Sequence, residues 1–196
     1  MAKIIDRPIL TLPEAEAKAL ATALRAAQVV LEYGSGGSTV MAADMGKTVI
    51  SVESDAEWLA GMQAWFAGHP PKGQVILHHG DIGPTGKWGM PTGPRSFRSF
   101  PSYALGIWDH PRFEHPDLVL IDGRFRAACL LATAFRISRP VTVLFDDYAE
   151  RDHYHGIEAM FRPRALHGRM AEFYVEPTAI PADQLAWVMG WFLKPQ

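Results

Sequence analysis

The sequence predicts an α/β fold in which a mostly parallel, seven-stranded sheet lies between two layers of helices. Short apolar runs typical of buried strands alternate along the chain with helix-length segments, and such alternation builds a parallel sheet with helices on both faces. The last two apolar runs have no helix-sized segment between them, so we expect them to pair antiparallel. With 196 residues, 48% of them hydrophobic, the whole chain is expected to form a single domain, residues 1–196.

Each element follows from a local pattern. The strands are expected where valine, isoleucine and leucine gather, at residues 29–31, 48–52, 74–78, 117–121, 141–145, 170–175 and 185–192. An alanine-rich helix over 11–27 has proline at an early position. The helix over 38–45 ends at Gly46, that over 54–68 begins with a capping pattern at 54–57, one covers 125–137, and that over 152–161 stops before Pro163.

The segment 80–116 is the irregular part of the chain, rich in proline and glycine and without clear periodicity. A connection of this length in a compact domain is typically a lid or a binding loop, so we expect a lid over the site. Its interleaved basic and aromatic residues also suit nucleic-acid binding, packing of the loop on itself, or a homodimer contact. The net charge of −2 argues against nucleic acid as a partner.

Cysteine content and hydrophobic runs indicate the compartment. Cys129 is the single cysteine, so no internal disulfide forms, and a reducing cytoplasm fits. Its alanine and leucine neighbours indicate a core position. The N-terminus lacks the pattern of a signal peptide, and the apolar stretch 185–193 is too short to cross a bilayer. A cytoplasmic protein without membrane contact is expected.

A glycine turn follows the first predicted strand. Gly34, Ser35 and Gly36 belong to a segment that joins the strand to the next helix, and glycine lets a backbone approach a ligand closely. Glu53 lies 19 residues after Gly34, at the end of the second strand. A carboxylate at that place accepts hydrogen bonds from ribose hydroxyls in nucleotide-binding α/β folds. The pattern predicts an adenosine-bearing cofactor.

Glu32 and Thr39 distinguish between cofactors. A pyrophosphate requires neutral or positive surroundings, yet Glu32 lies two residues before Gly34, and Thr39 stands where a dinucleotide motif has a third small residue. A carboxylate here suits a cofactor with an amino group and a sulfonium charge. A nicotinamide-dependent oxidoreductase is the alternative class of enzyme.

These patterns together resemble a known family. Residues 29–36 are similar to the first motif of class I S-adenosylmethionine-dependent methyltransferases, residues 51–53 to the second, and residues 80–82 to the third. The resemblance begins near Gln28 and implies a Rossmann-like three-layer sandwich.

The resemblance also implies a role for individual residues. Glu32, Gly34, Ser35 and Gly36 would lie along the amino-acid part of the cofactor, Glu53 would hold the ribose, Ser54 would flank the adenine, Asp81 and Ile82 would cover the adenine edge, and Asp122 would face the methyl-transfer site. Without the resemblance, Asp81 reads equally well as a turn residue.

Asp122, Asp146 and Asp147 end neighbouring predicted strands. Three converging carboxylates repel one another unless a cation or protons compensate, and oxygen ligands suit Mg²⁺ or Mn²⁺. The pattern is similar to cation-dependent catechol and caffeoyl-coenzyme A O-methyltransferases, with Asp147 in place of their usual asparagine.

The alternative to a metal is neutralisation by arginines close in sequence, namely Arg124, Arg126 and Arg151. Without a metal, Asp122 with His153 or His155 would have to accept the proton of the acceptor. In either case the expected reaction is methyl transfer to a small molecule, with O-methylation favoured over N-methylation. A third reading is a protein that binds the cofactor without catalysis.

Overall fold

Alternate residues of the central strands enter two different hydrophobic cores, and the sheet is therefore covered on both faces. In the computed structural model, which describes residues 5–196, Leu118 and Leu120 of β4 (Leu118–Ile121) pack with α1 and α2. Val119 and Ile121 of the same strand pack with α4 and α5 on the opposite face. This period of two is what an extended strand buried on both faces requires.

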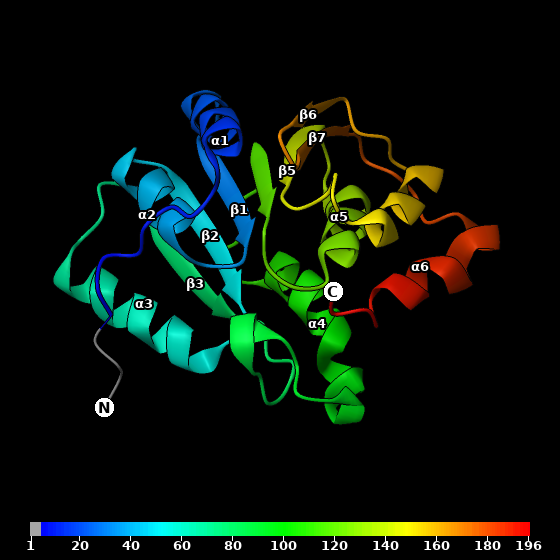
Figure 1. Ribbon diagram of the computed structural model, residues 1–196, viewed down its shortest axis with the longest axis horizontal. Coiled ribbons are helices and arrows are strands. Elements are labelled where there is room, and N and C mark those ends of the chain that lie inside the picture. The colour runs from blue at the N-terminus through cyan, green and yellow to red at the C-terminus, as the bar shows by residue number, and fades with distance from the viewer. Residues whose placement is uncertain (1–4) are drawn as a thin grey trace.

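The seven strands form one sheet in the order β3-β2-β1-β4-β5-β7-β6 (Figure 1). Strands β1 to β5 pair in parallel, and β7 pairs antiparallel with both β5 and β6. The other strands are β1 (Val29–Tyr33), β2 (Thr48–Glu53), β3 (Val75–His79), β5 (Val141–Phe145), β6 (Ala165–His167) and β7 (Met170–Val175).

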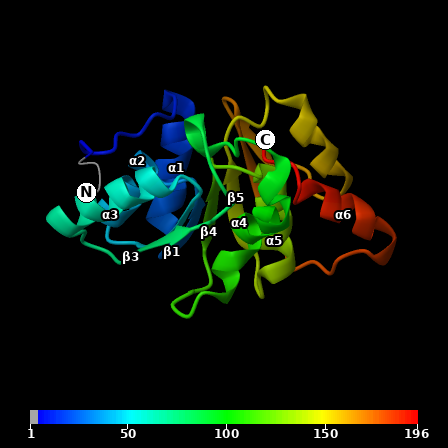
Figure 2. The ribbon, with the colours of Figure 1, turned by 90° about the horizontal axis from the view of Figure 1, so that it is seen from below.

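Helices cover both faces, with α1, α2 and α3 on one side and α4, α5 and α6 on the other (Figure 2). Their bounds are α1 (Glu14–Ala26), α2 (Gly37–Asp44), α3 (Ala56–Gly68), α4 (Phe100–Leu105), α5 (Arg126–Arg136) and α6 (Leu185–Trp191). The predicted helix over 152–161 is a 3-10 helix, η4 (Asp152–Ala159). These findings confirm the three-layer α/β fold. No helix within residues 5–196 is long and apolar enough to span a membrane.

The prediction of a strand over residues 185–192 is wrong. These residues form α6, in which Val188 and Trp191 are buried while Leu185 and Met189 are exposed. That spacing of three and four is helical, and a short apolar run does not by itself distinguish a strand from a helix. The antiparallel pair at the C-terminal end of the sheet is instead β7 with β6, whose three residues carry too little pattern to stand out.

The segment 80–116 has two structurally different halves. Residues 100–109 form α4 and η3 (Gly106–Asp109), and Phe100, Tyr103 and Trp108 are buried in the core that contains α5. A parallel crossover from β3 to β4 needs a covering element, and α4 supplies it, so this half is not a lid. Residues 81–99 hold short 3-10 turns, η1 (Lys87–Gly89) and η2 (Pro94–Ser99), and an isolated antiparallel bridge between Thr85 and Pro91.

Candidate functional site

A cavity of about 1070 Å³ opens at the carboxyl ends of β1, β2, β4 and β5. Ligands of open α/β sheets bind at this edge, where the strand order changes direction between β1 and β4. Eight of the predicted site residues line the cavity: Gly34, Ser35, Gly36, Glu53, Ser54, Asp122, Asp146 and Asp147. The cavity is therefore the candidate active site.

Position 34 requires glycine for two reasons, its backbone conformation and the closeness of Gly123. Its φ of +102° lies in the region that favours glycine, and a Cβ there would come within 2.8 Å of the Gly123 backbone nitrogen. The turns after β1 and β4 therefore touch. Gly36 differs, because no atom of the described residues lies within 4 Å of where its Cβ would be. The turn thus presents bare backbone to the cavity.

The N-terminal segment forms one wall of the cavity, which the sequence did not indicate. Residues 5–12 line it, and a Cβ on Gly37 would lie 2.1 Å from the carbonyl carbon of Ile9. Ile5 packs on Gly61 of α3. This segment carries no recognisable motif, so the sequence gives no signal that it forms a wall of the cavity.

Glu53 joins the second strand to the glycine turn. Its Oε1 accepts hydrogen bonds from the Ser54 and Asp55 backbone nitrogens at 2.7 and 2.9 Å, and Oε2 accepts one from the Ser35 nitrogen at 3.2 Å. Burial raises the pKa of Glu53, and these backbone donors oppose the rise. These donors fix the carboxylate at the cavity wall. Oε1 already accepts two backbone hydrogen bonds, whereas Oε2 accepts one and retains accepting capacity for a ligand.

Glu32 is not among the described residues that line the cavity, so its contact with the cofactor stays a prediction. The side chain is buried, and its carboxylate accepts hydrogen bonds from the hydroxyls of Ser38, Thr39 and Ser51. Glu32 thus stabilises the start of α2, because Ser38 and Thr39 belong to the first turn of that helix. The hydroxyls of Ser38 and Thr39, at the start of α2, hold the Glu32 carboxylate toward the interior of the protein.

The burial of Glu32 predicts a pH-dependent stability. Burial raises its pKa from 4.5 to about 7, with the three hydroxyls opposing the rise. The folded protein therefore binds this proton more tightly than the unfolded chain, and the free energy of unfolding should fall by ~3 kcal/mol as pH rises through this interval. Glu32→Gln should lack that component in urea unfolding followed at several pH values. An exposed counterpart, Glu57→Gln, should behave as the parent. Parallel pH curves for parent and Glu32→Gln would show that Glu32 is not the titrating group.

Asp81 and Ile82 do not line this cavity, and their contact with the adenine edge stays a prediction. Asp81 lines a second pocket that shares Ser54, Lys87 and Trp88 with the first. Asp81 is exposed and accepts a hydrogen bond from the Gly83 nitrogen at 2.9 Å, which is the geometry of a turn residue. Ile82 is buried in the core beside α4. The Ser54 hydroxyl donates to the Gly89 carbonyl at 3.0 Å, so the turn after Gly86 packs on the wall that Ser54 forms.

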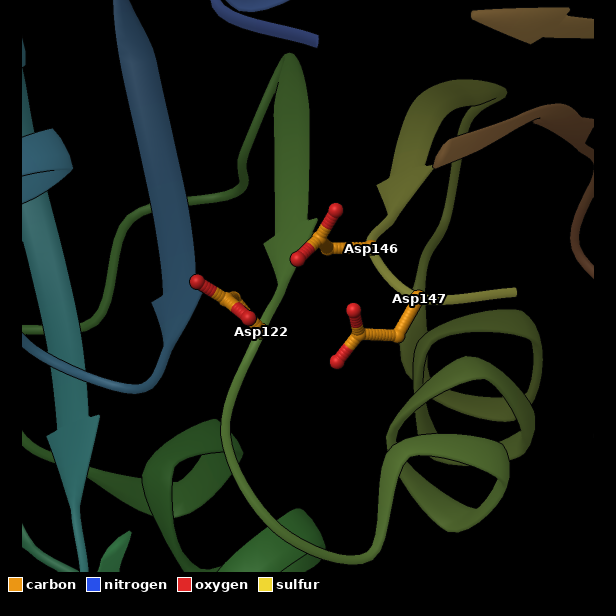
Figure 3. A group of neighbouring side chains, drawn as sticks. All are labelled: Asp122, Asp146 and Asp147. Atoms are coloured by element: carbon orange, nitrogen blue, oxygen red, sulfur yellow. The ribbon is translucent and has the colours of Figure 1, made fainter. Parts of the chain in front are cut away.

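The carboxylates of Asp122, Asp146 and Asp147 converge at the ends of β4 and β5, with one oxygen of each within 4.8 Å of the others (Figure 3). Three arginines neutralise them. Arg126 pairs with Asp122 and Asp147, both at 3.1 Å. The remaining ion pairs are Arg151 with Asp147 at 2.5 Å, Arg169 with Asp146 at 2.9 Å and Arg169 with Asp147 at 2.9 Å.

A divalent cation does not fit this cluster. Both oxygens of Asp146 and both of Asp147 already accept guanidinium contacts, and the three arginines balance the three negative charges. A metal would have to displace these cations, since positive charges repel it. The geometry therefore favours the alternative, in which arginines neutralise the aspartates through salt bridges. Arg169 forms two of these ion pairs, whereas Arg124, which the sequence suggested, forms none among the described residues.

We therefore expect Mn²⁺ and Mg²⁺ to leave the protein unchanged. Calorimetric titration of the protein with either ion should show no binding at the cluster, and a chelator should leave thermal stability unaltered, because the arginines already compensate the aspartates. Manganese binding that disappears in Asp147→Asn would contradict this expectation.

Asp122 faces the cavity and retains 32% of its side-chain accessible surface. The pKa of Asp122 is raised, first by removal from bulk water and then by Asp146 and Asp147, while Arg126 opposes the rise. Because part of the side chain still meets water in the open cavity, the rise should be complete only when a ligand displaces that water. Asp122 is thus placed to exchange a proton near neutral pH.

His153 does not reach the cavity. Its side chain is exposed and lies against Tyr154 in a tilted arrangement, at a ring-centroid distance of 4.2 Å, and it is not among the described lining residues. His155 lies beside Asp152 and the Tyr148 carbonyl. The structure therefore does not bring His153 to the candidate site, and its role as the proton acceptor stays a prediction.

The seven-stranded order, the glycine turn after β1 and the carboxylate that ends β2 define an α/β protein whose candidate ligand site lies at the switch point of the sheet. A solved methyltransferase-like protein from Silicibacter pomeroyi is 50% identical, with a TM-score of 0.93, covering 96% of this chain and 99% of its own. The chain belongs to the family of that methyltransferase-like protein, and its fold is the Rossmann-like fold of the class I S-adenosylmethionine-dependent methyltransferases.

More distant structures share the fold alone. The O-methyltransferase TomG from Streptomyces achromogenes, solved with S-adenosylmethionine, is 14% identical with a TM-score of 0.52, covering 84% of this chain and 79% of its own. The Bacillus cereus O-methyltransferase, solved with S-adenosylhomocysteine, is 12% identical with a TM-score of 0.53, covering 85% and 82%. No protein-family model and no curated protein sequence matches this chain.

Proposed function

We propose that this methyltransferase acts on a hydroxyl of a small-molecule acceptor. One observation carries the proposal: Glu53 and Asp122 line one cavity, with the bare backbone of Gly34 to Gly36 between them. A carboxylate at each end suits a ligand with ribose hydroxyls at one end and a reacting centre at the other. The two similar O-methyltransferase structures support oxygen as the methylated atom.

The residues of the cavity fit S-adenosylmethionine. Glu53 would accept hydrogen bonds from its ribose hydroxyls, and Ser54 would lie beside its base. The space over Gly36, where a Cβ would meet no described atom, leaves room for its amino-acid part. The cofactor supplies an electrophilic methyl group and leaves as S-adenosylhomocysteine.

Asp122 would receive the proton of the acceptor hydroxyl. A general base works best when its pKa lies near the operating pH, and the raised pKa of Asp122 meets that condition. Arg126, which is buried and bonded to the Asp122 carbonyl and carboxylate, would fix the orientation of this base. Rate acceleration would otherwise come from holding the two reactants in line.

Residues 81–99 would act as a lid over this site. Lys87, Trp88 and Gly89 line the cavity, and the Ser54 hydroxyl donates a hydrogen bond to the Gly89 carbonyl. Trp88 is 77% exposed and has a φ of 62°, so its ring is held outside the core, where it could cover a bound ligand.

Calorimetric titration with S-adenosylhomocysteine and with NADH tests the proposal. We expect micromolar binding of S-adenosylhomocysteine and none of NADH. Glu53 and Asp122 place carboxylates beside the glycine turn, and these would repel the pyrophosphate of NADH. The reverse preference would identify an oxidoreductase. Release of S-adenosylhomocysteine in the presence of a panel of phenols and alcohols then separates an enzyme from a protein that only binds the cofactor.

A further inference from the structure

Five arginines line the cavity, and four of them have carboxylate partners. Arg7 pairs with Asp44 at 2.7 Å, and Arg126, Arg151 and Arg169 pair with the three clustered aspartates. Arg124 is the fifth. Within residues 5–196 no carboxylate lies within ion-pair distance of its guanidinium, and its Nε is buried without a hydrogen-bond partner.

An unpaired guanidinium in such a place is costly, because a partly buried cation loses hydration without gaining a counter-charge. Burial lowers the pKa of Arg124, and Arg126 adds to that effect. The nearby aspartates cannot compensate, since three other arginines already neutralise them. The site therefore has one positive charge for which residues 5–196 supply no carboxylate partner.

The backbone of Arg124 is held firmly at the methyl-transfer end of the cavity. Its backbone N–H donates a hydrogen bond to the Tyr103 hydroxyl oxygen at 3.2 Å, and the preceding Gly123 lies against Gly34. Asp122, the proposed base, lies two residues away. Glu53, the proposed ribose ligand, ends β2, on the other side of β1 from β4.

We propose that Arg124 binds an anionic group, a carboxylate in the first instance, on the methyl acceptor. This inference rests on the proposed function and specifies its substrate class as small acidic molecules. A guanidinium binds a carboxylate through two parallel hydrogen bonds, so it would orient the acceptor as well as neutralise it. The acceptor hydroxyl would then be presented to Asp122.

The test uses the full chain saturated with S-adenosylhomocysteine and three probes: benzoate, its neutral analogue benzamide, and inorganic phosphate. Binding is followed by calorimetry and by the NMR signal of the Arg124 Nε–H group. We expect benzoate to shift that signal and benzamide to leave it unchanged. A response to phosphate alone would assign a phosphorylated acceptor to the same residue.

Variants separate the acceptor from the cofactor. Arg124→Gln should weaken benzoate binding at least tenfold and leave S-adenosylhomocysteine affinity within twofold, whereas Arg124→Lys should retain part of the benzoate affinity. Arg162→Gln, at an exposed position outside the cavity lining, is the matched control and should change neither.

Equal binding of benzoate and benzamide would overturn the proposal. So would a loss of S-adenosylhomocysteine affinity in Arg124→Gln, which would assign the arginine to the cofactor's own carboxylate. Failure of the parent protein to bind S-adenosylhomocysteine is a separate outcome, because it refutes the proposed function itself.

Discussion

Gly34→Ala is expected to lower both stability and cofactor binding. A side chain at its φ of +102° is strained, and the new Cβ would lie 2.8 Å from the Gly123 backbone nitrogen, so two backbone turns would have to separate. The strain alone costs ~1–2 kcal/mol, and with the clash we expect the Tm to fall by roughly 5 °C or more. Thermal unfolding without ligand measures the first effect, and calorimetry with S-adenosylhomocysteine measures the second.

Gly36→Ala provides the matched control. The backbone of Gly36 is extended, with a φ of 179°, and its Cβ would meet no described atom within 4 Å. This variant should unfold like the parent yet bind S-adenosylhomocysteine more weakly, because the added methyl group enters the cavity. Equal destabilisation by both substitutions would show that the contact between the turns after β1 and β4 is unimportant.

Glu53→Ala is expected to weaken S-adenosylhomocysteine binding at least tenfold, or ~1.4 kcal/mol. The substitution removes the acceptor proposed for the ribose hydroxyls and also releases the Ser35 nitrogen that Glu53 holds at 3.2 Å. Isothermal titration calorimetry gives the affinity directly. The effect has two sources, which a second variant distinguishes.

Glu53→Gln retains the size of the side chain and one accepting oxygen, so it should lose less affinity than Glu53→Ala. Glu57→Ala changes an exposed glutamate in the first turn of α3 and should leave affinity unaltered. If Glu53→Ala binds S-adenosylhomocysteine as tightly as the parent, Glu53 does not hold the ribose.

The sequence predicted those helices and strands whose local hydrophobic pattern matches their position in the fold. Apolar strands such as 141–145 and glycine-ended helices were recognisable because their periodicity matches their environment. Residues 185–192 were not, because a short apolar run fits both a buried strand and a helix. For α4, packing of Phe100 and Tyr103 decides the structure, and that packing depends on α5, which follows later in the chain.

The candidate site was predictable at strand ends and hidden elsewhere. Glu53 and Asp122 follow directly from the parallel sheet, since carboxyl ends of its strands meet at one edge. Side-chain direction was not predictable for Glu32, because it depends on hydroxyls of α2 below the turn. Arg169 lies in the connection between β6 and β7, and its contact with the β5 aspartates arises only from the antiparallel pairing.

A crystal structure of the protein with S-adenosylhomocysteine would locate the cofactor site. We expect the nucleoside to occupy the cavity, with its ribose hydroxyls bonded to the Glu53 carboxylate and its sulfur between Gly36 and Asp122. Arg124 should face the unfilled remainder of the cavity. A nucleoside bound away from Glu53, or a cavity that stays empty at saturating ligand, would refute the proposed site.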